Sequence, residues 1–460
     1  MRQYEKYNAV ETLWNLKFPA HWDVFPLCSM AKEKSICNCT DMELLSVYLD
    51  AGVVPFSKRT EKRTNTTSKD LSKYQRVDVG DFVLNNQQAW RGSVGVSKYT
   101  GITSPAYIIL SLNDQLTLDY ANYLFRSRIM VDQYLIVSKG VGSIQRSLYW
   151  QELKRASVLV PPKDEQDQIV RYLDWKVSNI NHLIHGYQRQ IDLLEERKRS
   201  FTFNAVTQGL QGDVVKTESP LYWLESVPAH WDTNSIAQLF TEVKNKNKGM
   251  QENNLLSLSY GAIKRRNINA TEGLLPASFE GYNIIEKDDI VLRLTDLQND
   301  HKSLRTGIAT ERGIITSAYL TIRNKSDNNP EFLQLFLHAF DLAKGFYNVG
   351  ASGVRQSLNW DTVKMLKVLT PPVPEQNQIV EAIKAEYSKI ETAINSVKKQ
   401  IELLREYRTR LISDVVTGQV DVRGVEIPDY TPEEDNAVDD ENNDTEEVTD
   451  NADSHQRKSF

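Results

Sequence analysis

The sequence predicts an α+β fold class: two similar mixed α/β globular domains separated by two long antiparallel coiled-coil helices, with pseudo-two-fold symmetry. Three observations predict it. One long stretch of sequence occurs twice, a shorter motif opens both halves, and each copy of the long stretch continues into a heptad pattern. With 460 residues, the chain is also too long for one ordinary hydrophobic core.

The repeated stretch reads GVGSIQRSLYWQELKRASVLVPPKDEQDQIVRYL at 140–173 and GASGVRQSLNWDTVKMLKVLTPPVPEQNQIVEAI at 350–383. The shorter motif, Pro-Ala-His-Trp-Asp, stands at 19–23 and again at 228–232. The interiors between these motifs match only faintly. We infer that two copies of one fold have kept their frame and diverged in their loops.

After each repeated stretch, apolar residues alternate in steps of three and four without a break, which is the seam of a coiled coil. Gly209 and Gly418 follow as the expected helix stops. The predicted seam comprises Leu173, Ile180, Ile184, Ile191 and Leu194 in the first helix, and Ile383, Ile390, Ile394, Ile401 and Leu404 in the second.

The direction of the two helices decides where the globular halves lie. An antiparallel pair would bring residue 206 near residue 376, and the halves would then sit at opposite ends of a shaft of roughly 54 Å. We therefore expect a dumbbell. The predicted segments are a first domain at 1–163, a central helix at 164–213, a second domain at 214–373, a C-terminal helix at 374–420 and a tail at 421–460.

Charge is distributed unevenly along the chain. Residues 428–460 hold 12 acidic and 2 basic residues with few large apolar side chains, so the tail is expected to be disordered. The rest of the chain carries a net charge of +4, which permits nucleic-acid binding. No apolar run is long enough to cross a membrane, no signal peptide begins the chain, and the three cysteines predict reduced thiols, so we expect a cytoplasmic protein.

The divergent interiors carry residue types that grip phosphates and read bases, because Arg reads guanine, Asn and Gln read adenine, and Lys mostly contacts phosphate. The candidates in the first half are Lys58, Arg59, Lys62, Arg63, Asn65, Lys69, Gln88, Arg91 and Lys98. Those in the second half are Lys244, Lys246, Lys264, Arg265, Arg266, Arg293, Asp296, Asn299, Lys302 and Arg305. Gln145, Arg146, Arg355 and Gln356, inside the repeated frame, could contact DNA or brace the glycine loop.

Catalysis has little support in the sequence. No phosphate-binding G-x-x-x-x-G-K-[ST] loop occurs, so the chain is not expected to hydrolyse ATP. The two Pro-Pro tetrads lack the leading Asp or Asn and the closing aromatic residue of an adenine-methyltransferase motif. His21 and His230, each beside a tryptophan, are interpreted as structural. We predict no catalytic, cofactor-binding or metal-binding residue in this chain.

Taken together, these motifs resemble the specificity subunit of type I restriction–modification systems. The resemblance rests on G-x-x-x-x-x-x-SL-x-W followed by PP-x-x-EQ-x-QIV, each twice and in order, and on the paired P-A-H-W-D motifs. It covers about residues 1–420 and leaves the acidic tail outside.

This resemblance implies that each domain is a target-recognition domain that reads one half of an asymmetric bipartite sequence in double-stranded DNA. It implies that the helices set the spacing of the half-sites and dock two modification (adenine methyltransferase) subunits, which restriction subunits join. S-adenosylmethionine, ATP and magnesium would then belong to those partners, and this subunit would not be an enzyme.

Two other functions stay open at the level of the sequence. A coiled-coil interaction scaffold would bind proteins rather than DNA, without a steep dependence on salt. A self-contained methyltransferase would need a site for S-adenosylmethionine that the sequence does not reveal. The tail is either tolerated disorder or a mimic of the charge of DNA.

Overall fold

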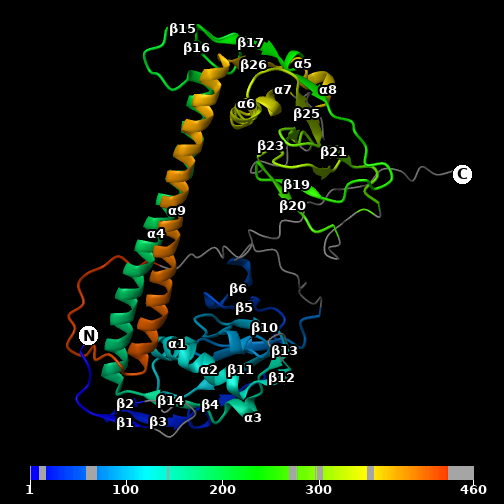
Figure 1. The fold of residues 1–460 in the computed structure, drawn as a ribbon. Coiled ribbons are helices and arrows are strands. Elements are labelled where there is room, and N and C mark those ends of the chain that lie inside the picture. Colours follow the sequence, from blue (N-terminus) through cyan, green and yellow to red (C-terminus); the bar gives the residue numbers. More distant parts are fainter. Residues whose placement is uncertain are drawn as a thin grey trace, which may run out of the picture. The chain divides into compact units, whose positions relative to one another are not determined.

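The computed structural model describes residues 2–9, 17–58, 70–141, 145–268, 276, 278–295, 297, 304–349 and 357–433. These form two compact units (Figure 1). Unit 1 contains Met1–Arg189 and Val397–Asp439, and unit 2 contains Gln190–Ser396 and Asp440–Phe460. Each unit therefore includes one end of both long helices.

Unit 1 is a mixed α/β domain built on a four-stranded sheet of order β4-β11-β8-β9. Its elements before the long helix are β1 (Tyr7–Ala9), β2 (Lys17–Pro19), β3 (Asp23–Pro26), η1 (Leu27–Ser29), β4 (Ala31–Glu33), β5 (Leu45–Tyr48), β6 (Gly52–Pro55), η2 (Phe56–Lys58), β7 (Gln75–Val77), β8 (Phe82–Asn85), η3 (Ala89–Arg91), β9 (Val94–Val96), β10 (Gly101–Thr103), β11 (Tyr107–Leu112), α1 (Leu118–Arg126), α2 (Arg128–Val137), β12 (Lys139–Val141), β13 (Gln145–Ser147), α3 (Trp150–Leu153) and β14 (Ser157–Val160).

Unit 2 repeats this architecture on a sheet of order β18-β25-β22-β23. Its elements between the long helices are β15 (Lys216–Glu218), β16 (Ser226–Pro228), β17 (Asp232–Ser235), α5 (Ile236–Leu239), β18 (Phe240–Glu242), β19 (Leu256–Ser259), β20 (Ala262–Arg265), β21 (Asn283–Ile285), β22 (Ile290–Leu292), β23 (Thr306–Ile308), β24 (Gly313–Ile315), β25 (Leu320–Asn324), α6 (Pro330–Leu342), α7 (Gly345–Val349), α8 (Trp360–Val363) and β26 (Lys367–Thr370).

Four further strand pairs of unit 1 have counterparts in unit 2, whereas β12-β13 has none among the described residues. The antiparallel pairs β1-β2, β3-β14, β5-β6 and β7-β10 of unit 1 correspond to β15-β16, β17-β26, β19-β20 and β21-β24 of unit 2. A parallel bridge, Leu44–Ile102, also has a counterpart, Leu255–Ile314. The prediction of two similar mixed α/β domains is confirmed, although outside the short frame motifs their sequences match only faintly.

The long helices are α4 (Lys163–Gln208) and α9 (Val373–Val416), within a few residues of the predicted bounds. Gly209 and Gly418, the predicted stops, have the left-handed φ values of +76° and +73° that glycine adopts without strain. Asp164 and Glu165 of α4 and Glu375 of α9 lie in the first turns, where the helix dipole favours negative charge.

Within each unit the two helices run antiparallel, as predicted. In unit 1, Arg408 Nη1 donates to Asn181 Oδ1 at 2.7 Å, while Gln168 bonds to carbonyl groups just beyond the end of α9. In unit 2, Thr202 and Tyr387 share a hydroxyl hydrogen bond of 2.7 Å. Of the predicted seam, Leu173, Ile180, Ile184, Ile383, Ile390, Ile394 and Ile401 are buried, and Ile191, Leu194 and Leu404 are half-buried.

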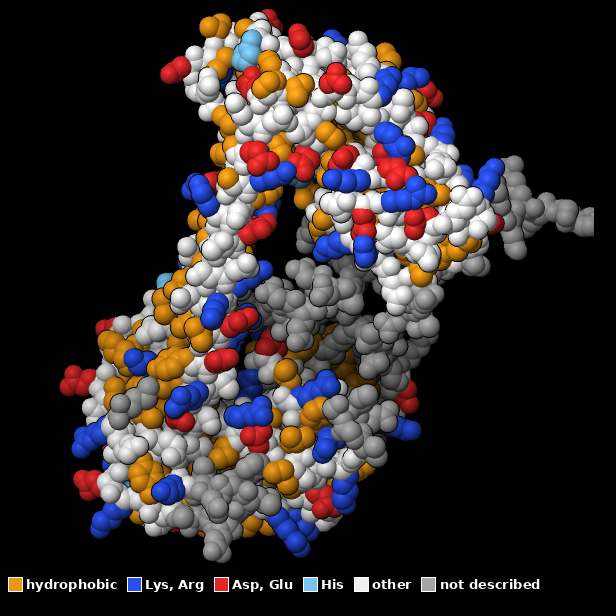
Figure 2. Space-filling model, in the orientation of Figure 1, with side chains coloured by type: hydrophobic (Ala, Val, Ile, Leu, Met, Phe, Trp, Pro, Cys, Tyr) orange, Lys and Arg blue, Asp and Glu red, His pale blue; other side chains and the backbone are white. Residues whose placement is uncertain are grey.

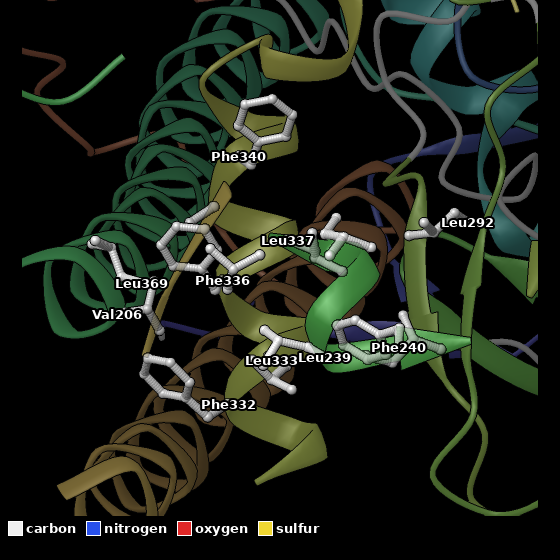
Figure 3. Packing of buried hydrophobic residues seen from close by; sticks show 14 of the residues in the cluster. Val206, Leu239, Phe240, Leu292, Phe332, Leu333, Phe336, Leu337, Phe340 and Leu369 are labelled. Atoms are coloured by element: carbon white, nitrogen blue, oxygen red, sulfur yellow. The ribbon is translucent and has the colours of Figure 1, made fainter. Parts of the chain in front are cut away.

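The largest buried cluster of unit 2 joins its domain to the long helices. Figure 3 shows Phe332 and Phe336 of α6 on the side of Val206 from α4, while Leu333 and Leu337 face α5. Phe332, Phe336 and Val206 are each at most 1% exposed. Because Val206 is buried among these side chains, the end of α4 forms part of the core of this domain. Burying large aromatic side chains stabilises a domain by a few kcal/mol each.

His338 of α6 gives unit 2 a predictable pH dependence. Burial lowers the pKa of this imidazole from 6.5 to about 4. The unfolded chain binds the proton at a higher pH than the folded chain, so the free energy of unfolding keeps this contribution in full above pH 6.5. It falls by roughly 3 kcal/mol as the pH drops toward 4. Urea unfolding at pH 7 and pH 4.5 should show a smaller pH effect in His338→Leu than in the wild-type protein. Equal pH effects in the two proteins would contradict this assignment.

The segment after α9 corrects one prediction. Residues 421–433 were expected to belong to a disordered tail, but they are ordered and lie along α4. Gln168 Nε2 donates to the carbonyl oxygens of Val422 and Val425 at 3.0 and 2.9 Å, and Ser178 Oγ donates to that of Thr431 at 3.0 Å. The physical reason is that the segment contains an apolar side chain, Val422, which is fully buried, and burying it stabilises the ordered conformation. Residues 434–460 lie outside the described residues.

Candidate nucleic-acid interface

The repeated motifs meet where each domain joins its long helix. In unit 1, His21 Nε2 bonds Glu165 Oε2 at 2.7 Å, and the Tyr4 hydroxyl donates to the other carboxylate oxygen. Glu165 is only 5% exposed, so its charge needs these partners. His21 of the opening motif therefore holds the Glu-Gln pair that begins α4.

Unit 2 repeats this junction with one change of partner. His230 Nε2 bonds Glu375 Oε2 at 2.8 Å, and the indole of Trp231 donates to Glu375 Oε1 at 3.1 Å in place of a tyrosine. The structure thus supports the interpretation of both histidines as structural. Because the His and the Glu both occur in each half, the sequence alone could have suggested that they form a pair.

The glutamine after each glutamate ties the helix to the domain. The Gln166 side chain accepts from Thr117 N at 2.7 Å and donates to the carbonyl oxygens of Gln115 and Pro161, both at 2.9 Å. Gln376 makes the equivalent bonds in unit 2, accepting from Asn329 N at 2.8 Å and donating to Pro371 O and Asn328 Oδ1. Both glutamines are completely buried. The repeated residues therefore hold the frame on which the divergent loops are carried.

The candidate DNA-binding residues of unit 1 lie at its surface where they are described. Lys58 lies over the ring of Tyr99, 5.0 Å from its centroid, and Arg91 lies 4.6 Å from the ring of Trp90. Lys98 pairs with Asp119 at 3.1 Å. Gln88 is exposed. Arg59, Lys62, Arg63, Asn65 and Lys69 lie outside the described residues.

Inside the repeated frame, Arg146 is half-buried and donates to the carbonyl oxygen of Leu135 at 3.3 Å. Of the two roles left open for this residue, bracing is the one that this contact supports. The side chain of Gln145 is outside the described part of the structure, as are Arg355 and Gln356.

In unit 2, several candidate cations already have partners. Lys244 pairs with Glu242 at 2.8 Å, and Lys246 donates to the carbonyl oxygen of Gly281, also at 2.8 Å. Arg265 contacts both carboxylate oxygens of Glu311, and its hydrogen bond lowers the pKa of that carboxyl. Exposed pairs of this kind contribute little to stability, so phosphate can replace the acidic partner at small cost. Lys264 and Arg266 are exposed.

One candidate is wrongly assigned. Arg305 was predicted to read a base, but it is only 5% exposed. Its guanidinium donates to the carbonyl oxygens of Thr295 and Leu297 at 3.2 and 3.4 Å and faces Asp341. Arg305 therefore supports its own loop from beneath, because a buried guanidinium must satisfy its donors inside the protein. Arg293 is half-buried beside it, and Asp296, Asn299 and Lys302 are not among the described residues.

The charge pattern on the visible face is mixed. Figure 2 shows Lys and Arg side chains interspersed with Asp and Glu over both units. Sequence reasoning also missed an internal charge cluster in unit 1, where Lys34 contacts Asp78 and Asp81, each at 2.5 Å. Within the described residues no group of His, Cys, Asp and Glu could hold a metal ion, and no described helix is long and apolar enough to cross a membrane.

Comparison with known proteins assigns the domain of unit 1. Residues 19–193 match the model of the type I restriction modification DNA specificity domain. This stretch is such a specificity domain. It covers most of the first domain and α4 as far as residue 193.

Two further comparisons extend over most of the chain. A putative type I restriction enzyme MjaX specificity subunit from Methanocaldococcus jannaschii is 20% identical over 373 residues, which cover 77% of this chain and 81% of that protein. A solved chain from a study of complex assembly and conformational transition of the type I R-M system shares the fold, with a TM-score of 0.55 and 12% identity over 88% of this chain and all of that one. The HsdS subunit from Thermoanaerobacter tengcongensis aligns over 88% of this chain and 98% of its own, at 12% identity and a TM-score of 0.45.

These findings confirm the predicted resemblance to type I specificity subunits. The strand order of the domain in unit 1, apart from β12-β13, recurs in unit 2. The chain thus resembles type I restriction–modification specificity subunits over most of its length, and its two units share one topology.

Proposed function

We propose that this chain reads an asymmetric, bipartite sequence in double-stranded DNA, with one half-site per unit, and that it does so without catalysing a reaction. The observation that carries the proposal is the combination of a repeated frame with divergent surfaces. The same glutamate and glutamine hold the helix in both units, whereas the exposed residues of equivalent strands differ. Two domains with the same fold and different exposed residues would recognise two different half-sites.

We further propose that modification subunits dock on the helix pair. Exposed apolar residues support this: Leu183 of α4 is 53% exposed, and Leu403 and Tyr407 of α9 are 52% and 43% exposed. Figure 2 shows apolar side chains gathered over the part of these helices that belongs to unit 1. Contiguous exposed apolar surface of this kind is typical of protein interfaces.

The chemistry of the complex would lie outside this chain. S-adenosylmethionine would be bound by two modification subunits, and ATP and magnesium by restriction subunits. The sequence has no phosphate-binding loop with which this chain could bind ATP itself. Acting on DNA, the complex would work in the cytoplasm.

Methylome sequencing of a host that carries this chain and its modification subunits tests the proposal. We expect a methylated motif made of two different half-sites separated by unspecified base pairs. A host lacking only this chain is the control and should lose the motif. Methylation of a single continuous sequence, or of no sequence that depends on this chain, would contradict the proposal.

The second candidate, an interaction scaffold, is favoured by the same exposed apolar residues on the helices. Salt separates the two functions, because each phosphate contact releases counterions and lowers log K by roughly 0.9 per tenfold rise in salt. The complex should lose affinity for a duplex steeply between 50 and 200 mM salt. A scaffold would show weak binding to DNA at both salt concentrations.

A further inference from the structure

The hairpin β19-β20 of unit 2 is a two-stranded ribbon with one apolar and one polar face. Residues alternate between the faces of a strand. Leu256, Leu258 and Ile263 point inward and pack in a buried cluster with strands of the domain. The opposite face carries Ser257 and Ser259 from β19 and Lys264 from β20.

This ribbon is held rigidly on the domain. A two-residue turn, Tyr260-Gly261, joins the strands, and both residues have left-handed φ values of +46° and +78°, the form that matches the twist of a hairpin. Beneath the ribbon lies Gly307 of β23, where a Cβ atom would stand 2.6 Å from Leu258 Cδ1. The close packing leaves the ribbon little freedom to shift.

The outward face is polar and partly cationic. Lys264 pairs across the strands with Ser257, so a hydroxyl and an ammonium lie side by side. Arg266, two residues further along the same face, is also exposed. Arg265 belongs to the other face, where Glu311 holds it.

The equivalent ribbon of unit 1, β5-β6, has the same strand pairing but different side chains at the matched positions, where Ser46 is buried and Val54 is half-buried. Ser46 pairs with Val54, as Ser257 pairs with Lys264 in unit 2. Gly95 lies beneath it in the position of Gly307, with a Cβ position 3.1 Å from Gly52 Cα. The two ribbons therefore differ in the chemistry of one matched position: an apolar side chain in unit 1 and a cation in unit 2.

We propose that the outward face of β19-β20 enters the major groove and that Lys264 contacts a base there, which makes it a determinant of the half-site read by unit 2. The major groove admits a two-stranded ribbon, and lysine donates to the guanine acceptors O6 and N7. Ser257 completes the pair, since a hydroxyl both donates and accepts. Val54, at the matched position of unit 1, suits an apolar contact with a thymine methyl group instead. This inference rests on the proposed function.

The test uses the full chain with its modification subunits and a library of randomised duplex DNA. The wild-type complex first selects its bipartite motif, and Lys264→Val then replaces the cation with the residue of unit 1. We expect discrimination at one base pair of one half-site to fall by roughly 5- to 150-fold, with the other half-site read as before. Lys325→Val, which removes an exposed lysine outside both the ribbon and the candidate DNA-binding residues, is the matched control and should select the wild-type motif.

Three outcomes would overturn the inference or its premise, and they are distinguishable. An unchanged motif, or an equal loss of affinity for all sequences, would show that Lys264 does not read a base, while the proposed function would stand. A wild-type complex that selects no bipartite motif would remove the proposed function itself. Because Lys264 is exposed, the variant should keep the wild-type melting temperature, and the intact second half-site serves as an internal check on folding.

Discussion

Gln376→Ala is expected to destabilise unit 2 by roughly 3–5 kcal/mol, because it leaves several buried polar groups unpaired. The amide of Gln376 bonds Asn329 N, Pro371 O and Asn328 Oδ1 at 2.8, 2.7 and 2.6 Å, and the side chain is fully buried. No water can replace those bonds without opening the junction between the domain and α9. Chemical denaturation of the full chain should show an early transition that belongs to unit 2.

The control lies two residues away in the same motif. Gln378 has the same side chain on the same helix turn but is exposed, so Gln378→Ala should change stability by less than about 0.5 kcal/mol. If both variants lost equal stability, the loss would come from the helix rather than from the buried amide, and the role assigned to Gln376 would be wrong. Hydrogen exchange should place the change at the start of α9 and in the loop of Asn328 and Asn329.

Gly313→Ala is the second large effect that we expect. A Cβ atom at this position in β24 would lie 2.5 Å from the backbone oxygen of Asn254 and 2.6 Å from Leu256 Cδ1. The neighbour is backbone, which cannot rotate away, so the ribbon that begins at Leu256 would have to shift. We expect a loss of roughly 3 kcal/mol in the free energy of unfolding of unit 2, measured by urea denaturation.

Gly281→Ala is the matched control for this substitution, because no atom lies within 4 Å of its Cβ position. It should keep wild-type stability or gain slightly, since alanine restricts the unfolded chain. We expect a similar effect at Gly101 of β10 in unit 1, because its Cβ position lies 2.4 Å from the backbone oxygen of Glu43. Gly101→Ala should lower the free energy of unfolding of unit 1 by a similar amount. Equal stability of the Gly313 and Gly281 variants would contradict the steric argument.

The frame of this protein could be predicted because its signals are local and occur twice. Each signal involves only neighbouring residues: the heptads of α4 and α9, the glycines that end them and the Pro-Pro pairs. Because each signal occurs twice, it can be recognised in the sequence. The His and the Glu are both repeated in the sequence, but only the folded chain brings His21 within 2.7 Å of Glu165.

The functional surface could be predicted only in part, since its residues owe their roles to neighbours far away in the chain. Arg305 reads like a base contact in the sequence, yet Asp341 and its own loop carbonyls bury it. Conversely, Ser257 and Lys264 gain meaning only as a cross-strand pair. The register of two strands decides which side chains share a face, and no local pattern states that register.

The amino-acid sequence by itself determined the duplication, the two long helices and the resemblance to type I specificity subunits, because periodicity and repeated motifs depend only on the order of residues along the chain. Tertiary structure alone decided which side chains are buried, that residues 421–433 lie along α4, and which side chains share a face of the β19-β20 ribbon. Burial and pairing depend on segments that are distant in the chain, so they exist only once it has folded.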